Sequence, residues 1–409
     1  MYDEHIFMMQ GGCMDFSKLT EYMDSIEKLY HIPGCDCSVY YRHREVYRHS
    51  AGYGDYAKSR PVSDDDLYWM YSCSKVACMA AVMQLAEQGK LRLDDPVGKF
   101  LPGIDRMKVR EGDSLVPLQV TPVIEDLMTM SAGFNYNGVL FAPNDPDVWP
   151  DFKRLVREKG QSAGTRELIN ELFKEPLDFQ PRSRFLYSMC HDVLAAVIEE
   201  ITGERFADYM KAAIAQPLGM KDFEYHLRPE DKDRLAAQYA FDPVSRELSG
   251  AGSANPAIIT ENYDSAGGGV ASRVSDYVLL ADALANDGVG ANGTKILSRE
   301  SIDNMRKDRM TGARAADFWK MAKYGHGYGL GVMTLVDRAA APLVPLGTFG
   351  WDGAGGAYLS ADVENHVAIF YAQHVFGYAD TYTVIHPNVR NLVYEALAGE
   401  LRRPGPRFA

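Results

Sequence analysis

No apolar run in the sequence reaches the length of about 20 residues that a membrane-spanning helix needs. The first residues, Met1 to Met14, include two acidic side chains and contain no basic segment followed by an apolar core. A secretory signal peptide has both of these features, so none is predicted here. The sequence therefore predicts a cytoplasmic protein that does not bind a membrane.

Positive charge is also scarce. The 409 residues include 43 Lys and Arg against 56 Asp and Glu, which gives a formal net charge of -13. Proteins that bind nucleic acids neutralise phosphates with Lys and Arg, so this balance argues against such a partner. The hydrophobic share of 46% is typical of a globular chain with a sizeable core.

Cysteines with the spacing of a zinc ribbon are absent, because the six cysteines contain no two C-x-x-C motifs. Cys35 and Cys37 lie two apart in a predicted strand, where alternate side chains share a face. They could hold a metal or form a redox pair, but buried free thiols are the commoner arrangement. We expect no metal and no cofactor.

The G-x-S-x-G turn of the α/β-hydrolases is absent as well. His191 and His374 could act as bases in an enzyme of that kind, but nothing pairs either of them with a serine, and we expect both to be structural. His326 is flanked by glycines and is a candidate for the rim of a pocket.

The order of the predicted elements indicates an α+β fold. Strands at both ends of the chain enclose a helical middle, which predicts one antiparallel sheet built from both termini with an inserted, mostly helical lobe. We assign residues 1–95 and 265–409 to the sheet domain and residues 96–264 to the lobe, with the active site between them. The predicted elements are helix Phe16–Tyr30, strands Cys37–Tyr41 and Glu45–Arg48, helices Pro122–Met130, Asp192–Thr202 and Phe206–Ile214, a helix capped by Ser275, helix Ser301–Asp308, strands Tyr328–Met333, Ala357–Leu359 and Val367–Tyr371, and helix Val389–Leu401.

A long loop follows the helix predicted at Pro122–Met130. It contains Pro143, Pro146 and Pro150. Loops of this length without secondary structure of their own are commonly functional, so we expect this one to form a lid or a wall that faces the substrate.

The segment Tyr71–Lys75 opens a predicted helix that ends at Gly89. Ser72 is a favourable N-cap residue, and the run after it is rich in strong helix formers. Residues three apart share a helix face, so Ser72 would present its hydroxyl beside the amine of Lys75. A lysine that is desolvated among apolar neighbours has a lowered pKa and can take the serine proton. This is the S-x-x-K pattern of serine nucleophiles.

Taken alone, this pattern also occurs by chance. The alternative is an ordinary helix start with a solvated lysine. Ser74 adds a second ambiguity, because Ser72 and Ser74 both flank Cys73, although only Ser72 lies three residues before Lys75. The rest of the chain has to decide between these interpretations.

Six segments in order supply that context. They are Gly52–Asp55 followed by Ser72–Lys75, Leu93–Val97, Tyr187–Met189 with the helix at Asp192, Pro217–Met220, Ala266–Ser272, and Gly350–Gly356. Together they resemble the serine beta-lactamase and penicillin-binding-protein-like superfamily, and within it the class C beta-lactamase-like carboxylesterases of the family VIII type and the related acyltransferases. The resemblance covers about Ile32 to Gln373 and implies a beta-lactamase/DD-peptidase-like fold.

The resemblance also implies roles for individual residues. Ser72 would be the nucleophile and Lys75 a base, and Tyr187 would be a second base whose phenol the lysine ammonium keeps partly ionised. The backbone N–H groups of Ser72 and Ala354 would form the oxyanion hole. The alternatives are a core tyrosine at position 187 and a simple hairpin turn around Ala354.

Departures from the family pattern bear on the substrate. Met189 stands where beta-lactamases of this type carry an asparagine, and Trp351 and Asp352 stand where they carry a lysine and a threonine. A thioether and an indole cannot bind the amide and carboxylate of a lactam as those residues do. Asp352 would repel an anionic substrate if it points inward. We therefore expect Met189, Trp351, Asp352 and Gly353 to bind a neutral acyl ester.

The sequence thus predicts a serine hydrolase that cleaves small-molecule carboxylic esters through an acyl-enzyme on Ser72. An acyltransferase would use the same residues with another acceptor. A true beta-lactamase or a D-amino-acid peptidase is a further alternative, and we expect it to be excluded by slow or absent lactam turnover. A non-catalytic binding relative would have no need of Ser72, Lys75 and Tyr187 together. The oligomeric state is left open.

Overall fold

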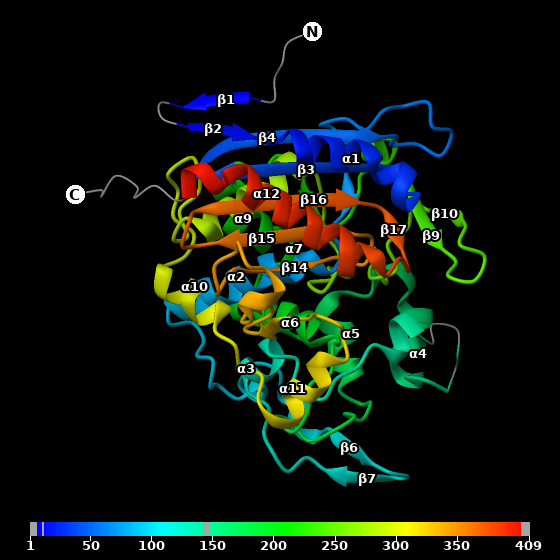
Figure 1. The fold of residues 1–409 in the computed structure, drawn as a ribbon. Coiled ribbons are helices and arrows are strands. Elements are labelled where there is room, and N and C mark those ends of the chain that lie inside the picture. The colour runs from blue at the N-terminus through cyan, green and yellow to red at the C-terminus, as the bar shows by residue number, and fades with distance from the viewer. Residues whose placement is uncertain (1–5, 10–11, 142–144, 146, 402–409) are drawn as a thin grey trace.

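A seven-stranded antiparallel sheet forms the centre of the protein (Figure 1). The computed structural model describes residues 6–9, 12–141, 145 and 147–401. The hairpin of residues 34–52 continues the sheet formed by C-terminal strands, which confirms the predicted α+β fold built from both ends. In sheet order the strands are His326–Tyr328 (β12), Met333–Leu335 (β13), Phe349–Asp352 (β14), Tyr358–Asp362 (β15), Val367–Gln373 (β16), Gly34–Tyr41 (β3) and Arg44–Gly52 (β4).

Helices cover the sheet. Helices α1 (Ser17–Tyr30) and α12 (His386–Leu401) contact each other, and α1 packs on β3 and β4. Helix α9 (Val274–Ala285) packs against β3, β15 and β16. The strand β16 is buried along its whole length, as expected for a strand with helices on both of its faces.

Helix α2 (Ser74–Glu87) joins the sheet to the helical lobe, since it contacts both β14 and α6 (Cys190–Thr202). Almost all of its residues are buried, which explains why its sequence is apolar on every side. The remaining helices of the structure are α3 (Ile124–Met128), α4 (Pro150–Lys159), α5 (Thr165–Leu172), α7 (Phe206–Met210), α8 (Gln216–Leu218), α10 (Arg299–Arg306) and α11 (Gly312–Trp319). The domain boundaries near residues 96 and 264 stay a prediction.

The short strands form smaller sheets. They are β1 (Ile6–Met9) with β2 (Gly12–Asp15), β6 (Lys108–Glu111) with β7 (Ser114–Pro117), β5 (Tyr68–Trp69) with β11 (Ala271–Ser272) and β8 (Phe223–Glu224), and β10 (Leu248–Gly252) with β9 (Gln238–Phe241) and β17 (Val375–Phe376). The sheet containing β5 matters most for function, because β5 leads directly into the turn that carries Ser72.

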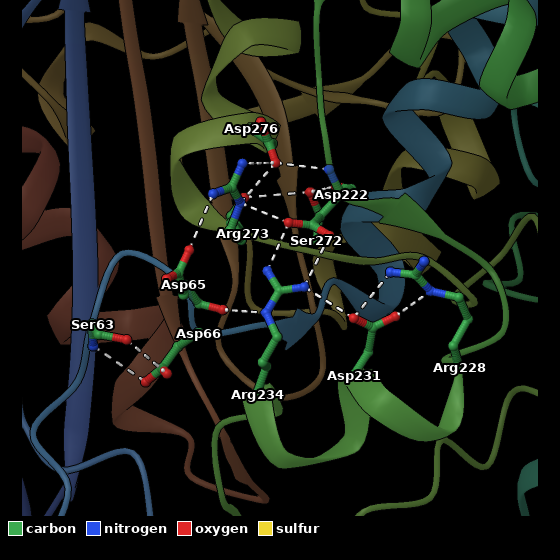
Figure 2. A network of polar contacts seen from close by, with 10 residues as sticks. All are labelled: Ser63, Asp65, Asp66, Asp222, Arg228, Asp231, Arg234, Ser272, Arg273 and Asp276. Carbon is green, nitrogen blue, oxygen red and sulfur yellow. Dashed lines mark hydrogen bonds and ion pairs between the residues drawn. The ribbon is translucent and has the colours of Figure 1, made fainter.

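A network of arginines and aspartates fixes this small sheet (Figure 2). Arg234 pairs with Asp222 at 2.7 Å and with Asp231 at 3.0 Å. Arg273 follows β11 and pairs with Asp222 and Asp276, each at 2.8 Å. Asp222 directly precedes β8, so the two arginines tie the ends of β8 and β11 together beside β5. Each additional partner restricts these side chains further, so the network adds rigidity beyond that of a single surface pair.

The structure corrects several predicted elements. The strand expected at Tyr328–Met333 is two strands, because the chain turns back at Gly331, which has a φ of +70°. Helix α9 begins at Val274 with Arg273 in the cap position, so Ser275 is not its N-cap. The helix expected from Pro122 begins at Ile124. Pro143 and Pro146 of the expected lid lie outside the described residues.

Five cysteines of the described chain are buried free thiols, Cys35 and Cys37 among them, which confirms the preferred interpretation of that pair. The side chain of Cys13 lies outside the described part. No helix in the described ranges combines the length and the apolar character needed to cross a membrane.

Candidate active site

Ser72 lies in a tight 3₁₀ turn, Tyr71–Cys73, immediately before α2. The helix cap position is Cys73, so the prediction that Ser72 caps the helix is wrong by one residue. Tyr71 has a φ of +44°, a conformation that costs energy for a residue with a side chain. Its phenol donates a hydrogen bond to Gln238, which holds the turn in place and leaves the neighbouring Ser72 partly exposed.

Lys75 lies beside Ser72 as the spacing predicts. Its Nζ donates a hydrogen bond to Ser72 Oγ at 3.2 Å and another to the carbonyl of Gly267. The side chain is 0% exposed, which excludes the alternative of a solvated lysine. Burial lowers the pKa of Lys75 to about 8, against the opposing effect of the Asp192 carboxylate.

Tyr187 completes a group of three side chains. Its phenol hydrogen-bonds Ser72 and accepts a hydrogen bond from Trp351 Nε1 at 2.9 Å. The Lys75 ammonium lies 4.7 Å from the centre of its ring. Burial raises the pKa of Tyr187 well above its ordinary value, so the expectation of a partly ionised phenol is wrong. In the resting protein the phenol is neutral and can donate a proton.

Ser74 has a different environment. It is buried, and its Oγ accepts a hydrogen bond from the backbone N–H of Val270 at 3.1 Å. Ser74 therefore fixes the glycine-rich segment Ala266–Ser272, whose Gly267 carbonyl receives the Lys75 amine. Ser72 lines the pocket and Ser74 does not, and the assignment of Ser72 as the nucleophile stays a prediction.

The motif Gly350–Gly356 packs directly against the Ser72 turn. A Cβ on Gly353 would lie 2.2 Å from the carbonyl oxygen of Met70, so only glycine fits there. Tyr382 Oη donates a hydrogen bond to the carbonyl of Ala354 at 2.9 Å. Ala354 and Ser72 line the same pocket, which is the arrangement that an oxyanion hole of their two N–H groups requires.

This catalytic pocket has a volume of about 380 Å³. Trp351 and Tyr187, whose rings stack 5.5 Å apart, form an apolar wall beside Ser72. Met189 does not line it, because its side chain is 1% exposed and lies in the core. The predicted contact between Met189 and the substrate therefore has no support in the geometry.

Lys323 is a residue of this pocket that sequence reasoning missed. It forms an ion pair with Asp352, and each of the two side chains is only 11% exposed. Its Nζ also lies 4.9 Å from the centre of the Tyr382 ring. The pair cancels the charge of Asp352, so the expected repulsion of anionic substrates does not follow. Nothing in the sequence indicates a partner 29 positions away.

Asp192 is a second residue that the sequence did not single out for the site. It is buried, and it accepts hydrogen bonds from Ser265 Oγ at 2.8 Å and from the N–H of Gly267 at 3.5 Å. The same Gly267 accepts a hydrogen bond from Lys75. Asp192 thus places a carboxylate beside the Gly267 segment that receives the Lys75 amine.

The three histidines fall in different places. His374 accepts from the N–H of Trp69 and contacts the carbonyl of Ala236, both at 2.8 Å, as a structural residue would. His191 is fully buried, and neither ring nitrogen has a partner in the described chain. His326 lines a second pocket beside Lys323, in keeping with its expected place at a rim. Within the described ranges no cluster of three His, Cys, Asp or Glu residues could hold a metal.

Comparisons with known proteins show what the chain is similar to. The family model described as "Beta-lactamase" matches residues 18–393. Protein Rv1367c of Mycobacterium tuberculosis is 29% identical over 359 residues, which cover 83% of this chain and 85% of that protein. Esterase EstB of Burkholderia gladioli is 31% identical over 339 residues, covering 77% and 79% respectively. The solved structure of EstCE1, described as "a hydrolase with promiscuous acyltransferase activity", has a TM-score of 0.75 at 22% identity and covers 93% of this chain and 98% of its own.

Proposed function

The chain belongs to the beta-lactamase family and is a serine hydrolase, and from this premise we propose that it cleaves carboxylic esters through an acyl-enzyme on Ser72. The observation that carries the proposal is the buried Lys75 amine, 3.2 Å from Ser72 Oγ and with a pKa of about 8. A lysine of this pKa exists partly as a free amine near neutral pH and can act as a general base.

In the first step, the Lys75 amine takes the proton of Ser72 while Ser72 Oγ attacks the ester carbonyl. The N–H groups of Ser72 and Ala354 donate to the oxyanion that forms. The neutral phenol of Tyr187 protonates the departing alcohol and regains a proton from the Lys75 ammonium. The products are the free alcohol and an acyl group on Ser72, with Lys75 and Tyr187 in their starting forms.

In the second step, water takes the place of the alcohol. The same groups remove its proton as it attacks the acyl carbonyl, and they return a proton to Ser72 Oγ as the bond to the acyl group breaks. This releases the carboxylic acid. Every step uses side chains of this chain, so the proposal involves no metal and no cofactor.

An ester is the preferred substrate because of the pocket wall. Trp351 offers an apolar surface, and its indole N–H is already donated to Tyr187. Asp352 is held by Lys323. Neither side chain is free to bind the carboxylate of a lactam. The relative EstB, which the chain covers over 79% of its length, is described as an esterase.

Transfer of the acyl group to an alcohol or amine is the second candidate. It uses the same residues and differs only in the acceptor that reaches the acyl-enzyme. Product analysis with added alcohols or amines separates the two activities.

Labelling with a fluorophosphonate probe tests the nucleophile. We expect the wild-type protein to be labelled and Ser72→Ala to lose all labelling. Ser74→Ala is the matched control, because it removes a neighbouring hydroxyl that faces Val270 rather than the pocket. Labelling retained in Ser72→Ala and lost in Ser74→Ala would assign the nucleophile to Ser74.

A further inference from the structure

A second pocket lies beside the catalytic pocket. It has a volume of about 220 Å³ and is formed where the β12–β13 hairpin and β15 meet the start of α12. Lys323, Asp352 and Tyr382 line both pockets, so the two meet at the Lys323–Asp352 ion pair. We call the second one the arginine pocket, after Arg390, which lines it together with His386 of the same helix, α12.

Arg390 is the feature that needs an explanation. It is 5% exposed and is the only arginine in the described chain that is buried. Its guanidinium makes two weak contacts of 3.4 Å with the side-chain oxygen of Asn391. Among the described residues no carboxylate forms an ion pair with it. Arg48 and Arg306, which are less buried, each pair with acidic side chains. A buried cation without an anionic partner is unfavourable unless a ligand supplies that partner.

The other charged groups around the pocket do not supply an anionic partner for Arg390. Asp352 is committed to Lys323, so that pair contributes no net charge. Burial lowers the pKa of His326 and of His386 to about 4, so both rings are neutral at physiological pH. The lining therefore carries one uncompensated positive charge in a protein whose net charge is -13.

His386 supplies a second unsatisfied polar group. It is 3% exposed, and its Nε2 lies 3.1 Å from the carbonyl of Gly356, to which it donates. Its Nδ1 is then an acceptor, and it has no partner in the described chain. At the same small pocket, α12 thus presents a buried guanidinium with only weak contacts and a buried imidazole nitrogen without a partner. Buried polar groups are seldom left unpaired unless a water or ligand binds them.

We propose that the arginine pocket binds a carboxylate group through Arg390, and that this carboxylate belongs to an arm of the ester substrate that reaches past Lys323 and Asp352 from the catalytic pocket. This rests on the proposed esterase function. The guanidinium matches a carboxylate by donating two parallel hydrogen bonds. The ester carbonyl itself lies in the catalytic pocket against its apolar wall, and only the remote end of the substrate is charged.

Two matched esters test this. The p-nitrophenyl monoester of adipic acid carries a free carboxylate, and the p-nitrophenyl methyl diester of the same acid is neutral. We expect kcat/KM of wild type to be higher for the monoester by about tenfold or more, as one charge-assisted interaction implies. In Arg390→Gln the ratio of the two values should fall to near one, and Arg390→Lys should retain part of it. A wild-type ratio of one or below, or a ratio unchanged in Arg390→Gln, overturns the proposal for a substrate arm.

A separate carboxylate ligand, which is not part of the ester substrate, is the alternative occupant of the arginine pocket. If adipate competes with the neutral diester in wild type but not in Arg390→Gln, and no preference for the monoester exists, the pocket binds a separate carboxylate ligand. Calorimetric titration of Ser72→Ala with adipate tests the pocket without turnover. If neither ester is hydrolysed, the proposed function fails while this titration still decides the pocket. If adipate does not bind to Ser72→Ala and wild type shows no preference for the monoester, the pocket is not a carboxylate site of either kind. This conclusion does not depend on whether Arg390→Gln folds.

Discussion

The pKa of Lys75 should fall when the charge of Asp192 is removed. A Cβ on Gly267 would lie 2.7 Å from Asp192 Oδ2 and 3.4 Å from Lys75 Nζ, so the two atoms are at most about 6 Å apart. At that distance and an effective dielectric constant of about 20, a unit negative charge stabilises the ammonium by about 3 kcal/mol, or about two pKa units. Hydrogen bonds to Asp192 from Ser265 and Gly267 spread part of this charge, so we expect a shift of about one to two units.

The sign follows from which form the carboxylate favours. Asp192 favours the charged lysine and raises the pKa of Lys75, opposing the lowering caused by burial. Asp192→Asn preserves the shape and removes the charge, so burial acts alone and the pKa falls below its present value of about 8. Since the free amine is the proposed base, the acidic limb of kcat/KM should move to lower pH by the same amount.

The assay is the pH dependence of kcat/KM for a neutral p-nitrophenyl ester, measured for wild type and Asp192→Asn. Ser265→Ala is the matched control, because it removes a hydrogen bond to Asp192 and leaves the charge in place. We expect the limb of this control to stay close to that of wild type. A limb that stays in place in Asp192→Asn, or moves to higher pH, would refute the assignment of Lys75 as the titrating base.

Three further predictions concern the same pocket. Tyr187→Phe should lower kcat for ester hydrolysis by about a hundredfold or more, because the leaving alcohol loses its proton donor. Stopped-flow measurement of alcohol release checks this prediction. An unchanged rate would mean that another group protonates the alcohol. Lys323→Met should lower the free energy of unfolding, measured in urea, by about 3 kcal/mol, because it leaves Asp352 buried without its partner. The double variant with Asp352→Asn should recover most of that loss. Equal stabilities of the single and double variants would contradict the reasoning. Nitrocefin turnover should be much slower than ester turnover, and comparable rates would reopen the beta-lactamase alternative.

The parts of the site that were predictable from sequence are those set by local geometry or by the order of segments. Ser72 and Lys75 are three residues apart at a helix start, so their contact depends on one turn of chain. Tyr187 and the glycines of Gly350–Gly356 were identified from their order along the chain, which resembles that of a known family. The sheet built from both termini followed from the same order of strands and helices.

The parts that were not predictable depend on burial and on contacts between distant segments. The ion pair of Lys323 with Asp352 exists only because the segment before β12 folds over β14. Met189 and Tyr187 are two residues apart, yet one lies in the core and the other lines the pocket, and residue type alone does not separate them. The hairpin at Gly331 appeared as one strand because a glycine in an apolar run is compatible with either structure.

In the proposed reaction, burial also decides which group acts as the acid and which acts as the base. Removing water disfavours the charged form of any group, so it lowers the pKa of Lys75 to about 8 and raises that of Tyr187 well above its ordinary value. The same cause therefore moves the amine toward a free base and the phenol toward a firmly held proton. A neutral phenol cannot take the serine proton, which leaves Lys75 to do so and Tyr187 to donate to the leaving alcohol. The direction of proton movement in the proposed reaction thus follows from how deeply the two groups are buried. The pH profile of Asp192→Asn tests the role of Lys75, because the pKa of about 8 of this group lies in the pH range of the assay.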